Sequence, residues 1–297
     1  MKILQAEDKM NLSDIIIVNH NSTDHLIACL ESLEKALGEL NANIFIQDNA
    51  SRDGVDRIIW KFPRVRLAEN PENLGFAKAV NKALRQGKGD YAVLLNPDTL
   101  IVSSFFENAL CFMRENPDVG IMGPRILDSD GRLQNSARSF PTPLTAFFGR
   151  TSLLSRIFPH NPLTRRNLLS LCSDGNTPMK ADWVSGACMI VRRKALDEVG
   201  PMDERFFMYW EDADWCRRMW EHGWKVIYNP QLCLYHHAGG SSEKTRFRSA
   251  LEFHKSAYLL FGKYLPPRLG FVKPLVFGGL AIRLYLVLFS HLLRRFF

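Results

Sequence analysis

Three polar corners of the sequence carry side chains that could do chemistry, and each comes directly after a run of aliphatic residues. Asn19 and Asn21 follow "IIIV", Asp48 follows "NIFIQ", and Asn96 and Asp98 follow "AVLL". Single Asx residues are ordinary turn and cap formers, but three such corners together favour a site. A carboxylate on a turn, with a polar residue two before it, suits Mg²⁺ or Mn²⁺ shared with a diphosphate. We therefore expect Asp98 to bind a divalent metal.

Asp48 suggests a second part of the same site. An ionised carboxylate only accepts hydrogen bonds, so Asp48 could accept one from the imide N–H of a uracil or thymine ring. Asp48 and Asp98 would then hold the two ends of a pyrimidine nucleoside diphosphate.

A cluster of acids opens a predicted helix in "EDADWCRRMWEHGW". Glu211, Asp212 and Asp214 stand in its first turn, where the helix dipole favours acids, and Asp214 with Arg218 makes an ordinary i, i+4 surface pair. The aromatic-rich run "FFMYW" leads directly into these acids. A carboxylate beside such an apolar wall is suited to act as a base. Further along, "YHHAGGSS" pairs His236 with His237, and flexible glycines follow them, which indicates a metal or phosphate role.

The elements that must position these residues alternate between strand and helix. Short β-branched runs are followed by leucines at helical spacing, as in "DIIIVNHN" and then "DHLIACLESLEKAL". This alternation predicts an α/β fold with a mostly parallel central sheet flanked by helices, whose ligands gather beyond the carboxyl ends of the strands. We also expect a single strand over "DWVSGACMIVRR", two short strands in "KVIYNPQLCLYHH" and a helix from about Glu243 to Tyr264.

Composition excludes several classes of protein. The 297 residues are 46% hydrophobic, so the chain can bury a large core and is not disordered. The net charge of +7 suggests anionic partners such as phosphates or lipid headgroups, and without a nucleic-acid-binding motif we expect no nucleic-acid partner. Six cysteines without a C-x-x-C pair, and an amino terminus that does not read as a signal peptide, indicate a cytoplasmic location.

The end of the chain has a different character. Residues 275–293 are largely apolar, with Arg283 near the centre. On a helix Gly279, Arg283, Ser290 and Arg294 fall on one side, which suits a helix lying in the membrane interface with its arginines toward headgroups. Insertion across the bilayer is close to balanced, and a core-packing helix at a homodimer contact is the other interpretation. We expect residues 243–297 to be a helical, membrane-associating extension.

Taken in order, these motifs resemble the family 2 glycosyltransferases with a GT-A fold, in particular the bacterial rhamnosyltransferase-like branch that builds cell-surface polysaccharides. Seven stretches covering about residues 13–242 carry the resemblance: "IIIVNHNS", "IQDNASRDG", "NPENLGFAKAVNKAL", "LLNPDT", "WVSGACMIVRR", "YWEDADWCRR" and "YHHAGGSS". The resemblance implies a glycosyltransferase domain over residues 1–242, with a nucleotide-binding half at 13–118 and an acceptor half at 119–242.

The resemblance also implies roles for the nucleotide and metal residues. In "NPD", Asn96 replaces the first acid of the family's D-x-D, which leaves Asp98 as the anionic metal ligand. His236 would complete the Mg²⁺ or Mn²⁺ shell, with His237 as the fallback. The nucleotide-binding residues would be Asn19, Asn21, Asp48, Asn73, Gly75, Asn81 and Asn96.

Enzymes like this invert the anomeric centre, and their base stands in the acid motif. Asp212 would be the base, with Glu211 or Asp214 orienting the acceptor. The sugar and acceptor would lie against Gly186, Ala187, Trp210 and Trp215. The resemblance further implies a dTDP- or UDP-linked rhamnose donor, a lipid-linked glycan acceptor, and a peripheral place on the inner face of the bacterial inner membrane.

Two other functions are compatible with parts of the sequence. A sugar-phosphate nucleotidyltransferase also uses an α/β sheet and a divalent ion, but it should show a glycine-rich basic loop after the first strand, where this chain has "NHNSTD". A non-catalytic membrane-bound glycan-binding protein would need neither a metal corner nor a candidate base.

Overall fold

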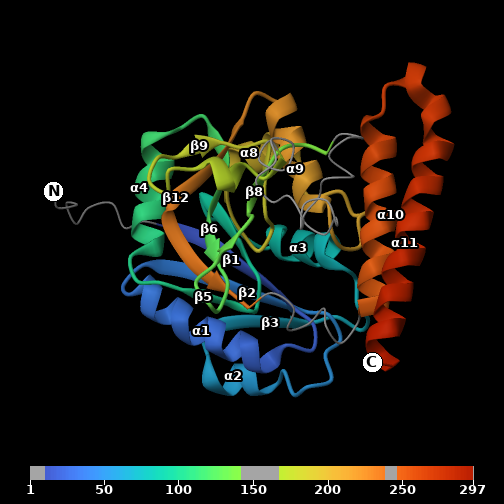
Figure 1. The fold of residues 1–297 in the computed structure, drawn as a ribbon. Coiled ribbons are helices and arrows are strands. Elements are labelled where there is room, and N and C mark those ends of the chain that lie inside the picture. Colours follow the sequence, from blue (N-terminus) through green and yellow to red (C-terminus); the bar gives the residue numbers. More distant parts are fainter. Residues whose placement is uncertain (1–10, 142–166, 238–245, 297) are drawn as a thin grey trace.

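The computed structural model describes residues 11–141, 167–237 and 246–296, and at its centre is a ten-stranded mixed sheet (Figure 1). In spatial order its strands are β3 (Val65–Glu69), β2 (Asn41–Asp48), β1 (Asn11–Asn19), β4 (Tyr91–Leu95), β11 (Cys188–Arg192), β6 (Val119–Leu127), β12 (Lys225–His236) and β5 (Thr99–Ile101), with β7 (Leu133–Gln134) on β6 and β9 (Met179–Lys180) on β12. A separate pair is formed by β8 (Ala137–Arg138) and β10 (Trp183–Val184).

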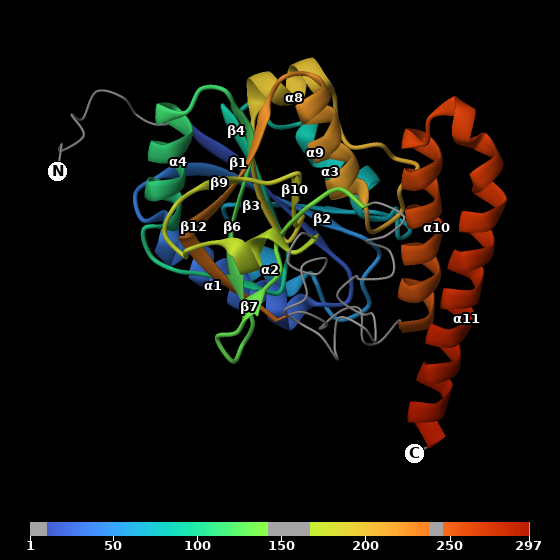
Figure 2. The ribbon, with the colours of Figure 1, turned by 45° about the horizontal axis from the view of Figure 1, so that its top comes forward.

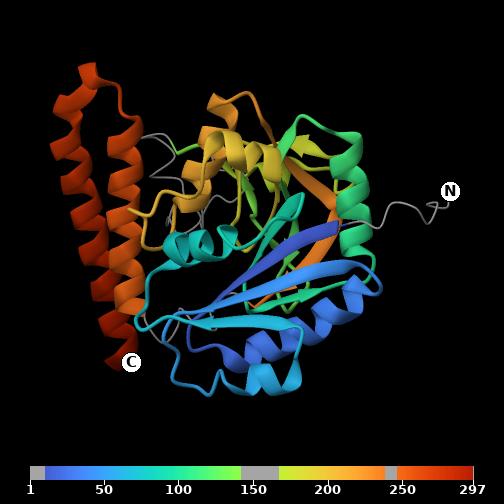
Figure 3. The ribbon, with the colours of Figure 1, turned by 180° about the vertical axis from the view of Figure 1, so that it is seen from behind.

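Helices cover the sheet on both faces. They are α1 (Thr23–Leu37), α2 (Arg57–Lys61), α3 (Phe76–Leu84), α4 (Phe105–Glu115), α8 (Arg193–Val199), α9 (Glu211–Glu221), α10 (Arg246–Tyr264) and α11 (Lys273–Phe296), with short 3₁₀ turns at Leu169–Cys172 and Pro267–Val272. Figure 3 shows α3 on one face of the first strands and α1 with α2 on the other.

The first four strands are parallel to one another, as the strand-helix alternation predicts. Successive side chains of a strand point to opposite faces, so a strand covered on both sides must be apolar throughout. In β1, Ile15 and Ile17 belong to the apolar cluster under α1 and α4, whereas Ile16 belongs to the cluster under α3 and α9. This is why "DIIIV" has no alternation of polar and apolar residues.

The second half of the sheet corrects two predictions. The expected single strand over "DWVSGACMIVRR" is broken into β10 and β11 by residues 185–187, because β10 pairs with β8 while β11 inserts antiparallel between β4 and β6. The two short strands expected in "KVIYNPQLCLYHH" are one strand, β12, whose register shifts between Asn229 and Cys233. Pro230 lies in this shift, since proline cannot donate to a strand ladder.

The last two helices form an antiparallel pair on one side of the body, with α10 between the body and α11 (Figures 1, 2 and 3). Lys263 of α10 binds Asp203 at 2.8 Å and Asp214 at 2.7 Å, and Ser256 donates to the backbone oxygen of Met208 at 2.9 Å. The predicted boundary at residues 242 and 243 lies outside the described residues, and so do the glycines that follow the histidine pair.

Candidate active site

The Asn96–Asp98 corner follows β4, and the pairing of β5 with β12 brings His236 onto it. Thr99 of β5 stands opposite His236 in the antiparallel register. The Nε2 atom of His236 lies 3.1 Å from Oδ1 of Asp98 and 3.3 Å from Nδ2 of Asn96. Three side chains predicted for the metal end of the site therefore meet, although His236 is 140 positions from Asn96.

Gln134, which no sequence pattern singles out, fixes the protonation of the His236 ring. The amide Nε2 of Gln134 donates to the backbone oxygen of His236 at 2.7 Å, so its Oε1 faces Nδ1 of the same ring at 2.9 Å. An amide oxygen only accepts, so Nδ1 carries the proton. The lone pair of Nε2 then faces Oδ1 of Asp98, and two acceptors at 3.1 Å need a proton or a cation between them.

The donor set of this corner fits a divalent cation. A carboxylate and an imidazole with its other nitrogen fixed by Gln134 are suitable ligands for Mn²⁺, and Mg²⁺ is bound in the same way through few protein ligands and substrate phosphates. Within the described ranges no group of three or more His, Cys, Asp or Glu side chains stands close enough to hold a metal. His237 takes another place, because its ring lies 6.2 Å from that of His25 while its backbone N–H donates to the backbone oxygen of Asp98.

Asp212 stands in the first turn of α9, and its carboxylate is held by two backbone N–H groups. Gly186 donates to Oδ2 at 3.0 Å, and Ala213 donates to Oδ1 at 2.8 Å. Burial raises the pKa of Asp212 above its ordinary value of 3.8, although these two N–H groups and the charge of Arg138 oppose the rise. Asp212 as a whole residue is half-buried.

Two successive residues join this acid to the metal corner. The N–H of Gly186 binds Asp212, and the carbonyl oxygen of Ala187 accepts from the backbone N–H of Asn96 at 2.9 Å. A side chain on Gly186 would begin 3.6 Å from Oδ2 of Asp212. Gly186 and Ala187, which were predicted to lie against the sugar, therefore form a turn between β10 and β11 that holds both ends of the candidate site.

Glu211 is more deeply buried than Asp212, and one of its carboxylate oxygens has no hydrogen-bond partner among the described residues. Its side chain is 6% exposed, and among the described residues nothing bonds its Oε2 atom. Burial, together with the neighbouring charge of Asp212, raises the pKa of Glu211 well above its ordinary value of 4.5. Because Glu211 is the more deeply buried of the two acids, its protonated form is favoured more strongly, which leaves Asp212 as the stronger candidate for a free carboxylate.

We expect Glu211→Gln to stabilise the protein at neutral pH. A raised pKa means that the fold favours the protonated form, so this contribution to stability is present below the unfolded-state pKa and is lost as the pH rises through the folded-state pKa. Glutamine stays neutral throughout. The melting temperature of the variant should therefore exceed that of the parent by a few degrees at about pH 8 and lose this advantage near about pH 4. A difference that does not change with pH would contradict the raised pKa.

An aromatic wall stands beside the acids, and its backbone is strained. Tyr209 and Trp210 have φ angles of 70° and 71°, a left-handed conformation that bulky residues rarely adopt. The ring of Phe253 from α10 lies 5.7 Å from Tyr209 and 5.3 Å from Trp210, and Trp183 lies 5.9 Å from Trp210. The Nε1 atom of Trp210 is buried and has no hydrogen-bond partner in the described part of the chain. Phe253 and Trp183 come from segments distant in the sequence, so no local pattern predicts that they pack against Trp210.

The first two polar corners meet in one hydrogen-bonded network. Nδ2 of Asn19 donates to Asp48 at 2.9 Å, and the backbone N–H and hydroxyl of Ser51 donate to Asp48 at 2.8 and 2.5 Å. Asn21 joins through its backbone N–H, which donates to the Ser51 hydroxyl at 2.8 Å. Asp48 is 1% exposed, so the structure shows it holding the loop, and the predicted contact with a base would require an exchange of these bonds. The Oδ1 atom of Asn19 is buried and unpartnered within the described residues.

The remaining residues predicted for the nucleotide pocket are Asn73, Gly75 and Asn81, and they differ in what they contact. Oδ1 of Asn73 accepts a hydrogen bond from the N–H of Gly75 at 3.0 Å. Gly75 has a φ angle of +83°, and a Cβ atom added there would lie only 2.4 Å from the backbone oxygen of Phe207. Glycine is required there. The buried amide of Asn81 binds the backbone of Met202 at 2.8 and 3.0 Å and so joins α3 to a neighbouring loop; its predicted contact with a nucleotide would require an exchange of these bonds.

Two predictions on α9 also need correction. The Asp214 carboxylate is fully buried and is bound by Arg218 at 3.0 Å, Lys263 at 2.7 Å and Tyr264 at 2.8 Å, so it is neither a surface pair nor free to orient an acceptor. Trp215 is 0% exposed and donates its Nε1–H to the Gly200 oxygen at 2.9 Å, which makes it a core residue. The spacing i, i+3 and i+4 places Asp214 and Trp215 on the same buried side of α9 as Glu211.

The model of the family described as glycosyl transferase family 2 matches residues 14–200, which include the Asn96–Asp98 corner and the Gly186–Ala187 turn. The chain belongs to this family. It is 30% identical to N-acetylglucosaminyl-diphospho-decaprenol L-rhamnosyltransferase of Mycobacterium tuberculosis, with 94% of each chain covered. It is 24% identical to a dTDP-rhamnosyl transferase of Shigella flexneri, over 77% of this chain and 70% of that one. The family and these relatives confirm a glycosyltransferase that resembles the rhamnosyltransferases.

Solved structures confirm the GT-A fold of this family 2 protein. A mannosyltransferase from Pyrobaculum calidifontis, in complex with GDP-Man and Mn²⁺, superposes with a TM-score of 0.57 at 16% identity, over 91% of this chain and 73% of that one. GalNAc-T7 with UDP, GalNAc and Mn²⁺ superposes with a TM-score of 0.56 at 15% identity, over 78% of this chain and 44% of that one. The predicted α/β architecture of a largely parallel sheet flanked by helices is therefore confirmed, together with an apolar helix at the carboxyl end.

Proposed function

We propose that this glycosyltransferase is an inverting, metal-dependent enzyme that moves rhamnose from a dTDP- or UDP-linked donor to a lipid-linked glycan in cell-surface polysaccharide synthesis, including O-antigen. The observation that carries the proposal is the turn at Gly186 and Ala187, which binds the candidate base with one residue and the candidate metal corner with the next. Leaving-group and nucleophile chemistry therefore have their side chains within one small region.

The metal corner would serve the leaving group. Asp98 and His236 would hold Mg²⁺ or Mn²⁺, with the Asn96 amide beside them, and the ion when bound would neutralise charge on the departing diphosphate as a Lewis acid. Gln134 keeps the His236 ring in the tautomer whose Nε2 is free to coordinate. The Mn²⁺ named for two neighbours of the same fold supports the choice of a divalent ion.

Asp212 would serve the nucleophile. An acceptor hydroxyl attacks the anomeric carbon, its proton passes to a carboxylate oxygen of Asp212, and the nucleoside diphosphate leaves from the opposite face of the sugar. The raised pKa of Asp212 brings its proton affinity closer to that needed at neutral pH. Two buried polar atoms without partners in the described residues, Trp210 Nε1 and Glu211 Oε2, are where acceptor hydroxyls would find a donor and an acceptor.

The acceptor class comes from the relatives. The name of the Mycobacterium tuberculosis relative specifies a decaprenol-linked N-acetylglucosaminyl diphosphate, and a related lipid-linked sugar is our proposed acceptor. A peripheral place on the inner face of the inner membrane, and the division into a nucleotide half and an acceptor half, remain proposals as well. Family membership sets aside the nucleotidyltransferase and the non-catalytic alternatives.

The donor is tested by incubating the purified full chain with Mn²⁺ and a panel of UDP-, dTDP- and GDP-linked sugars, and by measuring release of nucleoside diphosphate with and without a synthetic polyprenyl diphosphate-linked N-acetylglucosamine. We expect release with dTDP-rhamnose that increases when the acceptor is present and disappears with a chelator. If only GDP-linked sugars served as donors, or if the release of nucleoside diphosphate were unchanged in the presence of a chelator, the proposal would be contradicted.

A further inference from the structure

The outer face of α11 is a continuous apolar surface that nothing in the described chain covers. Five large side chains at helical spacing are each at least 48% exposed, namely Leu275 (73%), Ile282 (65%), Tyr285 (68%), Leu286 (59%) and Phe289 (48%). The segment Pro267–Ser290 has a mean hydropathy of 1.7, long and apolar enough by length and composition to cross a bilayer. A soluble surface seldom exposes so many large apolar residues side by side.

Arg283, the charged residue near the centre of α11, points toward α10 and away from the outer face. Arg283 donates from Nη1 to Nε2 of His254 on α10 at 2.9 Å, and its guanidinium lies 5.2 Å from the ring centre of Phe253. Burial lowers the pKa of Arg283 and of His254. The expectation that Arg283 faces headgroups is therefore wrong, because α10 supplies an aromatic and a histidine partner that the sequence of α11 does not reveal. The outer face is left without this cation.

Charge complementarity identifies the partner of this face. Glu252 is the last acid of the chain, and seven cations follow it, namely Lys255, Lys263, Arg268, Lys273, Arg283, Arg294 and Arg295. Removing these seven from the 38 Lys and Arg leaves 31, equal to the 31 Asp and Glu, so the part up to Glu252 is neutral and the last segment carries the whole net charge of +7. An apolar helix face within a wholly basic segment fits an anionic lipid surface.

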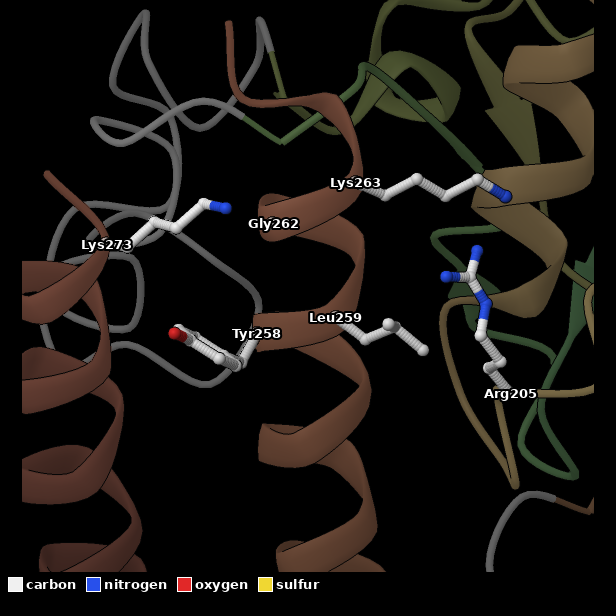
Figure 4. Close-up of a pocket in the computed structure, with 6 residues that line it drawn as sticks. All are labelled: Arg205, Tyr258, Leu259, Gly262, Lys263 and Lys273. Carbon is white, nitrogen blue, oxygen red and sulfur yellow. The ribbon is translucent and has the colours of Figure 1, made fainter. Parts of the chain in front are cut away.

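The cations near the start of α11 differ in whether they are paired with acids of the body. A cavity of about 270 Å³ here is lined by Arg205, Tyr258, Leu259, Gly262, Lys263 and Lys273. Figure 4 shows Arg205 and the Lys263 side chain on the body side of α10 and Lys273 on the α11 side. Arg205 and Lys263 are paired with Asp203, whereas Lys273 makes no salt bridge with any described residue. Lys273 and Arg268 are both exposed, so a headgroup phosphate can reach them.

The packing of α11 decides its orientation. It runs antiparallel to α10, with Phe277 against Tyr258 at 5.6 Å between ring centres and Arg283 against His254, and α10 is fixed to the body by Lys263 and Ser256. If α11 crossed the bilayer, α10 and one side of the body would enter the hydrocarbon with it. Figures 1 and 2 show α11 along the outside of that side.

We propose that α11 lies flat in the surface of an anionic membrane, with Leu275, Ile282, Tyr285, Leu286 and Phe289 in the acyl region and the body above it. Only α10 then lies between the lipid and the acids of α9 beside Trp210. The distance from the lipid to these acids is ~20 Å, two helix diameters. This attachment does not depend on the proposed donor, acceptor or metal, so its failure would leave the transfer reaction standing.

The first test is binding of the purified full chain to preformed vesicles, measured by sedimentation. We expect at least about tenfold tighter binding to phosphatidylcholine vesicles containing phosphatidylglycerol than to phosphatidylcholine alone. The double variant Ile282→Glu and Leu286→Glu should lose binding by at least about tenfold while still releasing nucleoside diphosphate from the donor. Trp60→Glu is the matched control, because Trp60 is 88% exposed but lies on α2. Equal loss in the control, or no binding by the parent, would overturn the proposal.

The second test separates a flat helix from a spanning one and from a dimer contact. Tryptophan is placed at the two ends and the centre of the face, by Leu275→Trp, Phe289→Trp and Ile282→Trp, and the extra fluorescence quenching over the parent is measured with lipids brominated at a shallow or a deep position. A flat helix gives equal depth at all three. A deeper centre than ends, or a dimer that the glutamate variant splits while vesicle binding is unchanged, would overturn the proposal.

Discussion

Asp212→Asn is expected to reduce transfer by about 10²–10⁴-fold, the usual contribution of a general base, while donor binding is retained. The carboxylate is fixed by the N–H groups of Gly186 and Ala213, so asparagine occupies the same place without accepting a proton. Its amide will face one of those two donors, and we expect a moderate loss of stability of ~1–3 kcal/mol. Transfer is measured with the lipid-linked acceptor, and donor binding by calorimetric titration with a nucleoside diphosphate and Mn²⁺.

Asp214→Asn is the informative comparison on the same helix. Asp214 is buried among Arg218, Lys263 and Tyr264, so its loss leaves buried cations without their partner and should lower stability by about 3 kcal/mol. Transfer by the folded fraction should stay within a few-fold of the parent. If Asp212→Asn turned over normally, or if Asp214→Asn showed the larger loss of turnover while folded, Asp212 would not be the base.

Asp98→Ala and His236→Gln are expected to remove Mn²⁺-dependent binding of the nucleoside diphosphate. Each takes away one of the two protein donors that face each other at 3.1 Å, and the diphosphate alone cannot retain the ion. Gln134→Leu should have a smaller effect, a loss of about 10–100-fold, because it only frees the His236 ring to rotate or to change tautomer. The affinity for the nucleoside diphosphate is measured by calorimetric titration in the presence of Mn²⁺ and, as a reference, in the presence of a chelator.

His237→Gln supplies the matched control for the metal corner. It replaces the neighbouring histidine, whose ring lies against His25 and whose contact with Asp98 is through the backbone. Binding should be unchanged within a factor of about two, which is the scatter between independent sites. Loss of Mn²⁺-dependent binding in His237→Gln, with His236→Gln unaffected, would exchange the two assignments.

The α/β fold and the polar corners could be predicted from the sequence because both are local signals. A strand buried on both faces must be apolar throughout, as in β1, and a turn after it must expose polar atoms. The same reasoning reached Asn96, Asp98 and the acids of α9. It failed at Asp214 and Trp215, where an acidic or aromatic residue of a site motif is fully buried in contacts with other segments of the chain.

The sequence alone determined which chemical groups exist and the order in which strands and helices present them, since hydrophobic period and turn chemistry act over a few residues. Tertiary structure alone decided which groups meet. The β5–β12 pairing places the His236 ring beside Asp98, while His237 contacts Asp98 through its backbone. The turn at Ser185–Ala187 connects Asp212 with Asn96. The contact with α10 turns Arg283 inward and leaves an apolar face of α11 outside. Each of these is a contact across a large separation in sequence, whose partner is fixed by sheet register and helix packing.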